Sequence, residues 1–158
     1  MAADLVLDLP DLGATQALAA ALADLARPGD VFALRGDLGS GKTTFARAFI
    51  AQAAGGEVEV PSPTFNLVLT YATGQGAIWH FDLYRVAKAD ELVELGLDEA
   101  LADGISLIEW PERMGAALPA KALIVELLPG AAGPDSRRAR LSGGHAWSRR
   151  LVPTFASS

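Results

Sequence analysis

The sequence predicts an α/β protein, a three-layer sandwich in which helices cover a mixed β-sheet. Three observations support this fold class. Strand-like apolar runs alternate with helical runs along most of the 158 residues, and a glycine-rich loop joins one strand-like run directly to a helix. Two other strand-like runs are separated only by a short turn. Alternation of strands and helices is typical of parallel pairing, whereas a short turn predicts an antiparallel hairpin, so the sheet should contain both.

The N-terminal elements follow from periodicity and from their boundaries. Residues 5–9 alternate in polarity and predict a short strand. Residues 14–26 are rich in Ala and Leu, which favours a helix that residues 28–29, Pro and Gly, would end. Residues 31–34 form a continuous apolar run that predicts a buried strand, and residues 44–51 predict the next helix.

The middle of the chain predicts a hairpin followed by short helices. Residues 66–71 and 78–84 are strand-like, and the turn near residues 74–76 is glycine-rich. We therefore expect these two strands to pair in antiparallel fashion. Residues 89–95 and 98–102 predict two short helical pieces.

The C-terminal part supplies the remaining strands. Residues 105–108 and 123–128 are short apolar runs typical of buried strands. Residues 137–141 predict a last strand and residues 145–151 a short helix. The sequence contains no repeat, linker or low-complexity segment, so we predict one domain spanning residues 1–158.

The loop after residues 31–34 carries the most informative motif. It reads G-x-x-x-x-G-K-[ST], a P-loop, and it lies between a predicted strand and a predicted helix as that motif requires. Its glycines allow successive N–H groups to face phosphate oxygens, and the helix N-terminus adds positive potential. Lys42 can reach the outer phosphates, and the Thr43 hydroxyl can ligate Mg²⁺. The sequence thus predicts a P-loop NTPase-like fold with ATP and Mg²⁺ as cofactors. The expected phosphate-binding residues are Gly36, Asp37, Leu38, Gly39, Ser40, Gly41, Lys42, Thr43 and Thr44.

Two acids are candidates to orient the metal or the attacking water. Glu109 directly follows the apolar run at residues 105–108, which is the layout of a Walker B element. Asp82 lies on a strand where alternation places His80, Asp82 and Tyr84 on one face and Trp79, Phe81 and Leu83 on the other. We expect Asp82 and Glu109 to be catalytic and, with Thr43, to bind the metal. A turn-capping Asp82 and a helix-capping Glu109 are the structural alternatives, and the residues do not decide which acid activates water.

Three further residues are candidates with open alternatives. Thr64 lies in Pro61-Ser62-Pro63-Thr64-Phe65, where two prolines stiffen the loop, so it is either a switch threonine near the γ-phosphate or part of a rigid connector. Trp110 would pack beside the nucleotide or a partner, or within the core. His80 would act as a base or as a hydrogen-bonded strand histidine.

Charge and composition exclude several classes of function. Residues 1–130 contain eight basic and eighteen acidic residues, and residues 131–158 contain five Arg and one Asp. An acidic body argues against autonomous nucleic-acid binding and gives no reason to expect DNA as a partner. The basic stretch would face an acidic partner or RNA, or be a solvated surface. With no cysteine, no basic leader and no membrane-length apolar run, we expect a cytoplasmic location.

Taken together, these motifs resemble the TsaE family, also called YjeE. The matching segments are the P-loop at residues 36–44, Pro61 to Phe65, His80-Phe81-Asp82-Leu83-Tyr84-Arg85, Glu94 to Glu99, and Leu107 to Arg113. They occur in unchanged order, and the resemblance extends from about residue 11 to 128. The segment after Pro129 lacks a sharp family motif.

The resemblance implies an ATPase that works with TsaB and TsaD in bacteria. That machinery installs threonylcarbamoyl on an adenosine beside the anticodon of tRNAs that read codons beginning with A, and the transfer itself belongs to TsaD. The family member would hydrolyse ATP and support turnover of the complex, meeting tRNA only indirectly. By position, the resemblance makes Asp82 and Glu109 the acidic site residues and places Thr64 in the switch-like loop and Trp110 near the nucleotide.

Three other functions remain open from the residues. A P-loop small-molecule kinase would need an acceptor pocket and usually an arginine-bearing lid, and no inserted segment resembles a lid. A GTPase would carry a guanine-reading Asn-Lys-x-Asp, which is absent. A binding module in which ATP only orders a docking surface would use the same loop.

Overall fold

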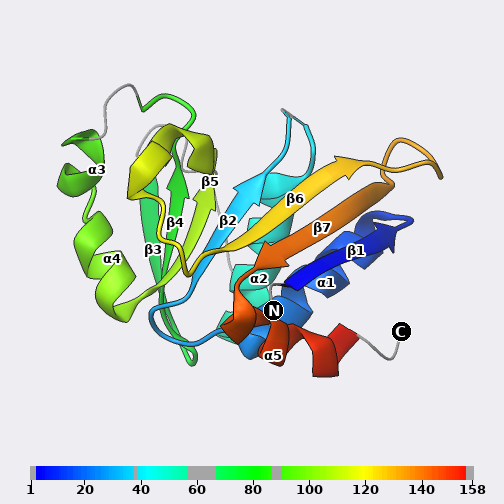
Figure 1. Ribbon diagram of the computed structural model, residues 1–158, viewed down its shortest axis with the longest axis horizontal. Coiled ribbons are helices and arrows are strands. Elements are labelled where there is room, and N and C mark those ends of the chain that lie inside the picture. The colour runs from blue at the N-terminus through cyan, green and yellow to red at the C-terminus, as the bar shows by residue number, and fades with distance from the viewer. Residues whose placement is uncertain (1–2, 38, 57–66, 87–89, 156–158) are drawn as a thin grey trace.

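The computed structural model describes residues 3–37, 39–56, 67–86 and 90–155 and shows seven strands in a single sheet (Figure 1). The strands are β1 (Ala3–Leu9), β2 (Val31–Arg35), β3 (Val68–Thr73), β4 (Gly76–Asp82), β5 (Ile105–Glu109), β6 (Leu123–Pro129) and β7 (Arg137–Gly143). The helices are α1 (Leu12–Leu25), α2 (Lys42–Ala54), α3 (Asp90–Glu94), α4 (Leu97–Asp103) and α5 (His145–Phe155), with a 3₁₀-helix η1 (Pro111–Ala117). None of these helices is long and apolar enough to cross a membrane.

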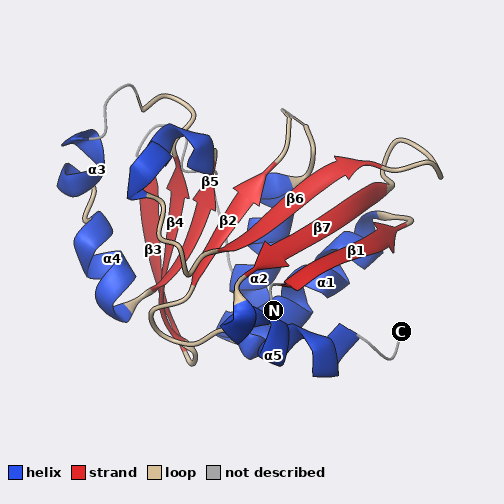
Figure 2. Cartoon of the chain, viewed as in Figure 1, coloured by secondary structure: helices blue, strands red, loops and turns tan. Residues whose placement is uncertain are grey.

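The sheet is mixed, as predicted, in the order β1-β7-β6-β2-β5-β4-β3 (Figure 2). Strands β6, β2, β5 and β4 pair in parallel, whereas β3 pairs with β4, and β7 with β6 and β1, in antiparallel fashion. The predicted hairpin is therefore β3–β4. Since parallel strands end at one edge, the segments that follow β2, β4, β5 and β6 all meet there.

Helices cover both faces of the sheet and form the predicted three layers. On β2, Phe32 and Leu34 pack into a core with α1, α2 and α5, whereas Val31 packs into a second core with α3, α4 and η1. Successive side chains of a strand point to opposite faces, so the two cores lie on opposite sides of the sheet. In Figure 1, α1 and α2 lie behind the sheet and η1 lies in front of it.

Element boundaries differ from the prediction where local contacts extend a helix or shorten a strand. Helix α1 begins at Leu12 rather than residue 14, because the Asp11 carboxylate accepts a hydrogen bond of 2.8 Å from the Ala14 amide. Strand β4 begins at Gly76 and ends at Asp82 rather than running from residue 78 to 84. Helix η1 was not predicted. It starts with Pro111, directly after Trp110 in a left-handed conformation with φ 60°.

Most arginines of the basic C-terminal stretch contact other groups of the same chain. Arg138 and Arg140 pair with Asp8 and Asp4 across the β7–β1 ladder, with N–O distances of 3.2 and 3.0 Å. These side chains are more than half exposed, so water and salt screen both pairs and they add little to stability. Arg137 and Arg150 also bind groups of this chain, and Arg149 is exposed. Much of the stretch is thus neutralised by the acidic body of the protein.

We expect Arg150→Ala to destabilise the fold by about 2 kcal/mol. The Arg150 guanidinium donates to both Asp30 carboxylate oxygens at 3.0 and 2.7 Å, and it lies 4.1 Å from the centroid of the Trp147 ring. The bonds to Asp30 fasten α5 to the loop before β2. Thermal denaturation should show a midpoint lowered by roughly 4–8 °C. Arg149→Ala is the control and should leave the midpoint within about 1 °C, and equal midpoints for both variants would contradict the prediction.

Candidate phosphate-binding site

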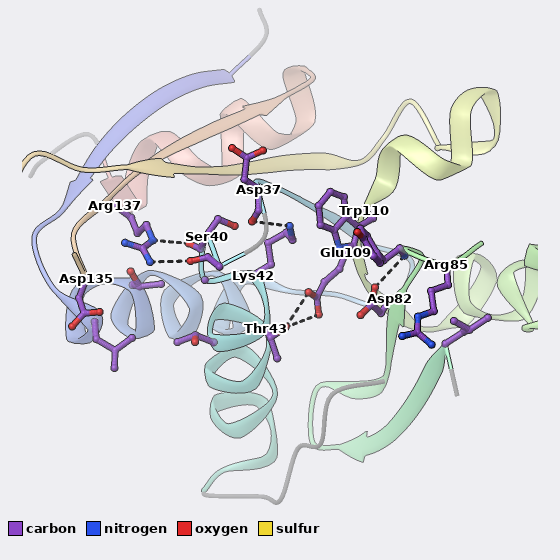
Figure 3. A pocket seen from close by; sticks show the side chains of 17 residues that line it. Asp37, Ser40, Lys42, Thr43, Asp82, Arg85, Glu109, Trp110, Asp135 and Arg137 are labelled. Atoms are coloured by element: carbon purple, nitrogen blue, oxygen red, sulfur yellow. Dashed lines mark hydrogen bonds between the residues drawn. The ribbon is translucent and has the colours of Figure 1, made fainter. Parts of the chain in front are cut away.

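A cavity of about 510 Å³ opens at the carboxyl edge of the parallel strands (Figure 3). The P-loop after β2 forms its floor, the ends of β4 and β5 form one side, and α1 with the β6–β7 connection forms the other. Its lining includes Leu12, Thr15, Asp37, Gly39, Ser40, Gly41, Lys42, Thr43, Thr44, Asp82, Tyr84, Arg85, Glu109, Trp110, Asp135 and Arg137. The predicted residues Leu38 and Thr64 lie outside the described part of the chain.

The P-loop takes a conformation that strongly favours glycine. Gly36, Gly39 and Gly41 have φ values of 152°, 77° and 104°. At Gly36 a Cβ atom would lie 2.9 Å from the Leu127 carbonyl oxygen, so a side chain there has no room. Gly41 caps α2, which begins at Lys42. The positive end of α2 therefore faces the cavity.

The Lys42 ammonium is buried within this loop. It donates hydrogen bonds to the Gly36 carbonyl and, at 3.2 Å, to the Asp37 carbonyl, and it lies 3.6 Å from the centroid of the Trp110 ring. Burial lowers the pKa of Lys42, and the negative charge of Glu109 is the strongest opposing influence. A phosphate group in the cavity would supply the counter-charge that the buried ammonium lacks.

The two candidate acids lie together at the ends of adjacent strands. Asp82 on β4 pairs in register with Glu109 on β5. The Thr43 hydroxyl, on the first turn of α2, donates to the Glu109 carboxylate at 3.1 and 3.3 Å. Asp82 accepts a hydrogen bond of 3.1 Å from the Tyr84 amide, while burial, reinforced by the charge of Glu109, raises the pKa of Asp82. Negative charge is thus concentrated beside the P-loop, where a cation would relieve it.

These side chains suit a magnesium ion that arrives with a nucleotide. Within the described ranges, no group of three or more His, Asp or Glu side chains could hold a metal by itself. Mg²⁺ usually takes one or two protein ligands and completes its shell with phosphate oxygens and water. The Thr43 hydroxyl and the Glu109 carboxylate form such a small oxygen set next to the phosphate loop.

The tryptophans divide between the site and the core. Trp110 is half-buried, lines the cavity and packs against Tyr84 with ring centroids 4.9 Å apart. Trp79 instead packs against the second core. His80, one of the open candidates, is fully buried and hydrogen-bonded to Glu109.

Arg137 is a site residue that sequence reasoning missed. Its guanidinium donates to the carbonyls of Ser40, at 2.7 Å, and Gly39, at 3.1 Å, and so fastens the P-loop to β7 (Figure 3). The arginine is 97 residues from Ser40 in sequence. The local sequence around residue 137 carries no motif, and only the sheet order, which places β6 and β7 beside β2, brings it here.

This chain is similar to proteins of one known family. A family model described as "Threonylcarbamoyl adenosine biosynthesis protein TsaE" matches residues 9–138. Proteins named tRNA threonylcarbamoyladenosine biosynthesis protein TsaE are similar to this chain. The one from Bacillus subtilis is 41% identical over 124 residues, covering 78% of this chain and 75% of that protein. The one from Rickettsia bellii is 43% identical over 113 residues, covering 72% and 78%.

Coverage differs among the relatives. The protein of the same name from Rickettsia felis is 47% identical over 98 residues, and the match spans 57% of its length. Among solved structures, the crystal structure of Bacillus subtilis YdiB superimposes with a TM-score of 0.77 at 27% identity. That superposition covers 99% of this chain and 97% of YdiB, so the similarity in fold extends to the C-terminal helix that the family model leaves out.

Proposed function

The chain belongs to the TsaE family, and from that premise we propose that it is the Mg²⁺-dependent ATPase of the tRNA threonylcarbamoyladenosine system. The observation that carries the proposal is the contact between Thr43 on the P-loop helix and Glu109 at the end of β5. A hydroxyl and a Walker B carboxylate in contact beside a P-loop lysine are the parts that phosphoryl transfer requires.

Each site residue then has a distinct role. The P-loop amides and Lys42 would bind the β- and γ-phosphates, and Thr43 with Glu109 would hold Mg²⁺. When bound, the ion supplies charge neutralisation to the phosphates. Asp82, with its raised pKa, lies next to Glu109 and would orient water or a water ligand of the ion.

The direction of the nucleotide in the cavity follows from the same arrangement. Glu109, Asp82 and Arg85 lie on one side of Lys42, and Arg137 and Asp135 lie on the other (Figure 3). The γ-phosphate would face the acids, and the nucleoside would extend towards Arg137 and the start of α1. The Leu12 side chain, which is 47% exposed, offers the base an apolar contact there.

The proposed partners are the TsaB and TsaD proteins, with tRNA met only through that complex. Family membership supports this assignment. The charge distribution agrees with it, because the chain is acidic overall and several arginines of its basic C-terminal stretch bind aspartates and carbonyls of the same chain. TsaD would carry out the transfer, and ATP hydrolysis here would support its turnover.

We expect Asp82→Asn and Glu109→Gln to fold, to bind ATP and to lose hydrolysis by about 10²–10⁴-fold. Both changes keep side-chain shape and remove charge, so they separate electrostatics from packing. Phosphate release with the TsaB–TsaD pair present measures the effect, alongside calorimetric ATP binding. Asp135→Asn, an acid on the opposite side of the cavity, is the matched control and should keep kcat. Wild-type hydrolysis in both variants would refute the roles assigned to these acids.

We expect ATP to change the tryptophan fluorescence of the protein through Trp110. The Lys42 ammonium that now lies over its ring would turn to the phosphates and change the environment of the indole. Of the three tryptophans, Trp79 and Trp147 pack in the cores, so Trp110→Phe should remove most of the change and Trp79→Phe should keep it. A signal that survives in Trp110→Phe but disappears in Trp79→Phe would reverse this assignment.

A further inference from the structure

A fully buried histidine lies directly behind the Walker B carboxylate. His80 on β4 has no exposed surface, and its Nε2 atom lies 2.7 Å from Oε2 of Glu109, which is itself only 3% exposed. An ionised carboxylate can only accept hydrogen bonds, so Nε2 carries a proton and donates it to Glu109. None of the roles assigned above uses this contact.

The other ring nitrogen indicates what the histidine is for. Nδ1 is buried and makes no hydrogen bond to any residue in the described ranges. Buried polar groups normally have partners, and an unpaired one costs roughly 1–3 kcal/mol. Among the described residues, this imidazole makes one hydrogen bond, the one to Glu109. Because His80 is buried with one ring nitrogen unpaired and its other nitrogen bonded to Glu109, its role is to hold the Glu109 carboxylate in place.

Glu109 is held from two elements at once. Thr43 donates to the carboxylate from α2, and His80 donates to it from β4. In the parallel register of β4 and β5, His80 pairs with Leu107 and Asp82 pairs with Glu109. The imidazole therefore lies on the strand next to Glu109, two residues before the residue that pairs with Glu109. Two donors from separate elements fix the rotation of a carboxylate, which a single donor leaves free.

We propose that His80 is a positioning residue for Glu109. It keeps the carboxylate turned towards Thr43, so that the oxygen set for Mg²⁺ is oriented before the nucleotide arrives. The expected effect of His80 on Mg²⁺-dependent ATP binding rests on the proposed function. The hydrogen bond between His80 and Glu109 does not depend on any ligand. His80 acts through Glu109 and is not assigned a contact with the nucleotide.

Substitution at residue 80 tests the consequence. Calorimetry would measure ATP affinity with and without Mg²⁺ for the wild type, His80→Phe and His80→Gln. Removing such a supporting contact typically costs about 10- to 100-fold in metal affinity, so His80→Phe should lose that much of the Mg²⁺-dependent gain. His80→Gln keeps a side-chain amide donor and should recover most of it. Mg²⁺-free ATP affinity should be unchanged in both.

A matched control and a double-mutant cycle separate positioning from packing. Ser106 on β5 is also fully buried, and its hydroxyl has no hydrogen-bond partner among the described residues, so Ser106→Ala should behave as the wild type. In a Glu109→Gln background, His80→Phe should have no further effect on the Mg²⁺-dependent gain. A full additional loss in that background, or a wild-type gain in His80→Phe, would overturn the proposal.

The hydrogen bond can be tested without any ligand. The chain has two histidines, so two-bond ¹H–¹⁵N spectra of the free protein are readily assigned by comparison with His80→Gln. We expect a slowly exchanging proton on Nε2 of His80 that shifts in Glu109→Gln, with His145 unchanged. An unprotonated Nε2, or an Nε2 proton signal that does not shift in Glu109→Gln, would overturn the inference even if the protein binds ATP. A wild type that binds no ATP while showing this signal would instead refute the proposed function.

Discussion

Lys42→Ala is expected to weaken ATP binding by about 100-fold or more. Two charge-assisted hydrogen bonds from the ammonium to phosphate oxygens would contribute roughly 1.5 kcal/mol or more each, and about 3 kcal/mol corresponds to 10²-fold in Kd. The ammonium is buried in the P-loop, and burial lowers its pKa. The ammonium places a positive charge close to the phosphates, whose negative charge the loop amides alone cannot balance.

Isothermal titration with Mg²⁺ and ATP measures this loss. Lys121→Ala is the matched control, because Lys121 is exposed and does not line the cavity, so it should bind as the wild type. Thr43→Ala should lose mainly the Mg²⁺-dependent part of the affinity. Wild-type affinity in the Lys42→Ala protein would mean that ATP does not bind in this loop.

The sequence predicts those parts of the site whose positions depend on residues nearby in the sequence. The P-loop motif includes its own glycines, its lysine and the helix that follows, so its geometry is local. Glu109 is predictable because an acid that ends an apolar strand must lie at the sheet edge where parallel strands finish. Asp82 follows from alternation along one strand, and the structure pairs it in register with Glu109.

The parts that escape prediction depend on contacts between distant segments. Nothing near Arg137 indicates that it binds the P-loop carbonyls, because that contact exists only once β6 and β7 lie beside β2. Alternation places His80 on the same face as Asp82, yet its bond to Glu109 depends on which strand pairs with β4. Helix η1 was missed because it follows a left-handed Trp110, a conformation that no residue pattern indicated.

The arrangement of arginines leads to the last prediction, that this chain is a slow ATPase alone. Arg137 is committed to the carbonyls of Gly39 and Ser40, so it supports the loop and is not free to meet the γ-phosphate. Arg85 lines the cavity near Asp82 but is exposed to solvent, which weakens its effect on transition-state charge. A partner that covered this side of the cavity would exclude water and either order Arg85 or supply a cation of its own.

Covering the site in this way should raise turnover steeply. A cation placed on the transferring phosphoryl group is worth about 10³–10⁵ in rate, so turnover with a TsaB–TsaD pair should approach that gain over the isolated chain. The measurement is phosphate release by the chain alone, with the pair, and with the pair plus tRNA, using Arg85→Ala to ask whether the cation comes from this chain. Stimulation lost in Arg85→Ala would place the cation here, and stimulation retained would place it on the partner. Equal turnover in all three mixtures would refute the coupling and favour a small-molecule kinase or a self-sufficient ATPase, since neither needs a protein partner to complete its site.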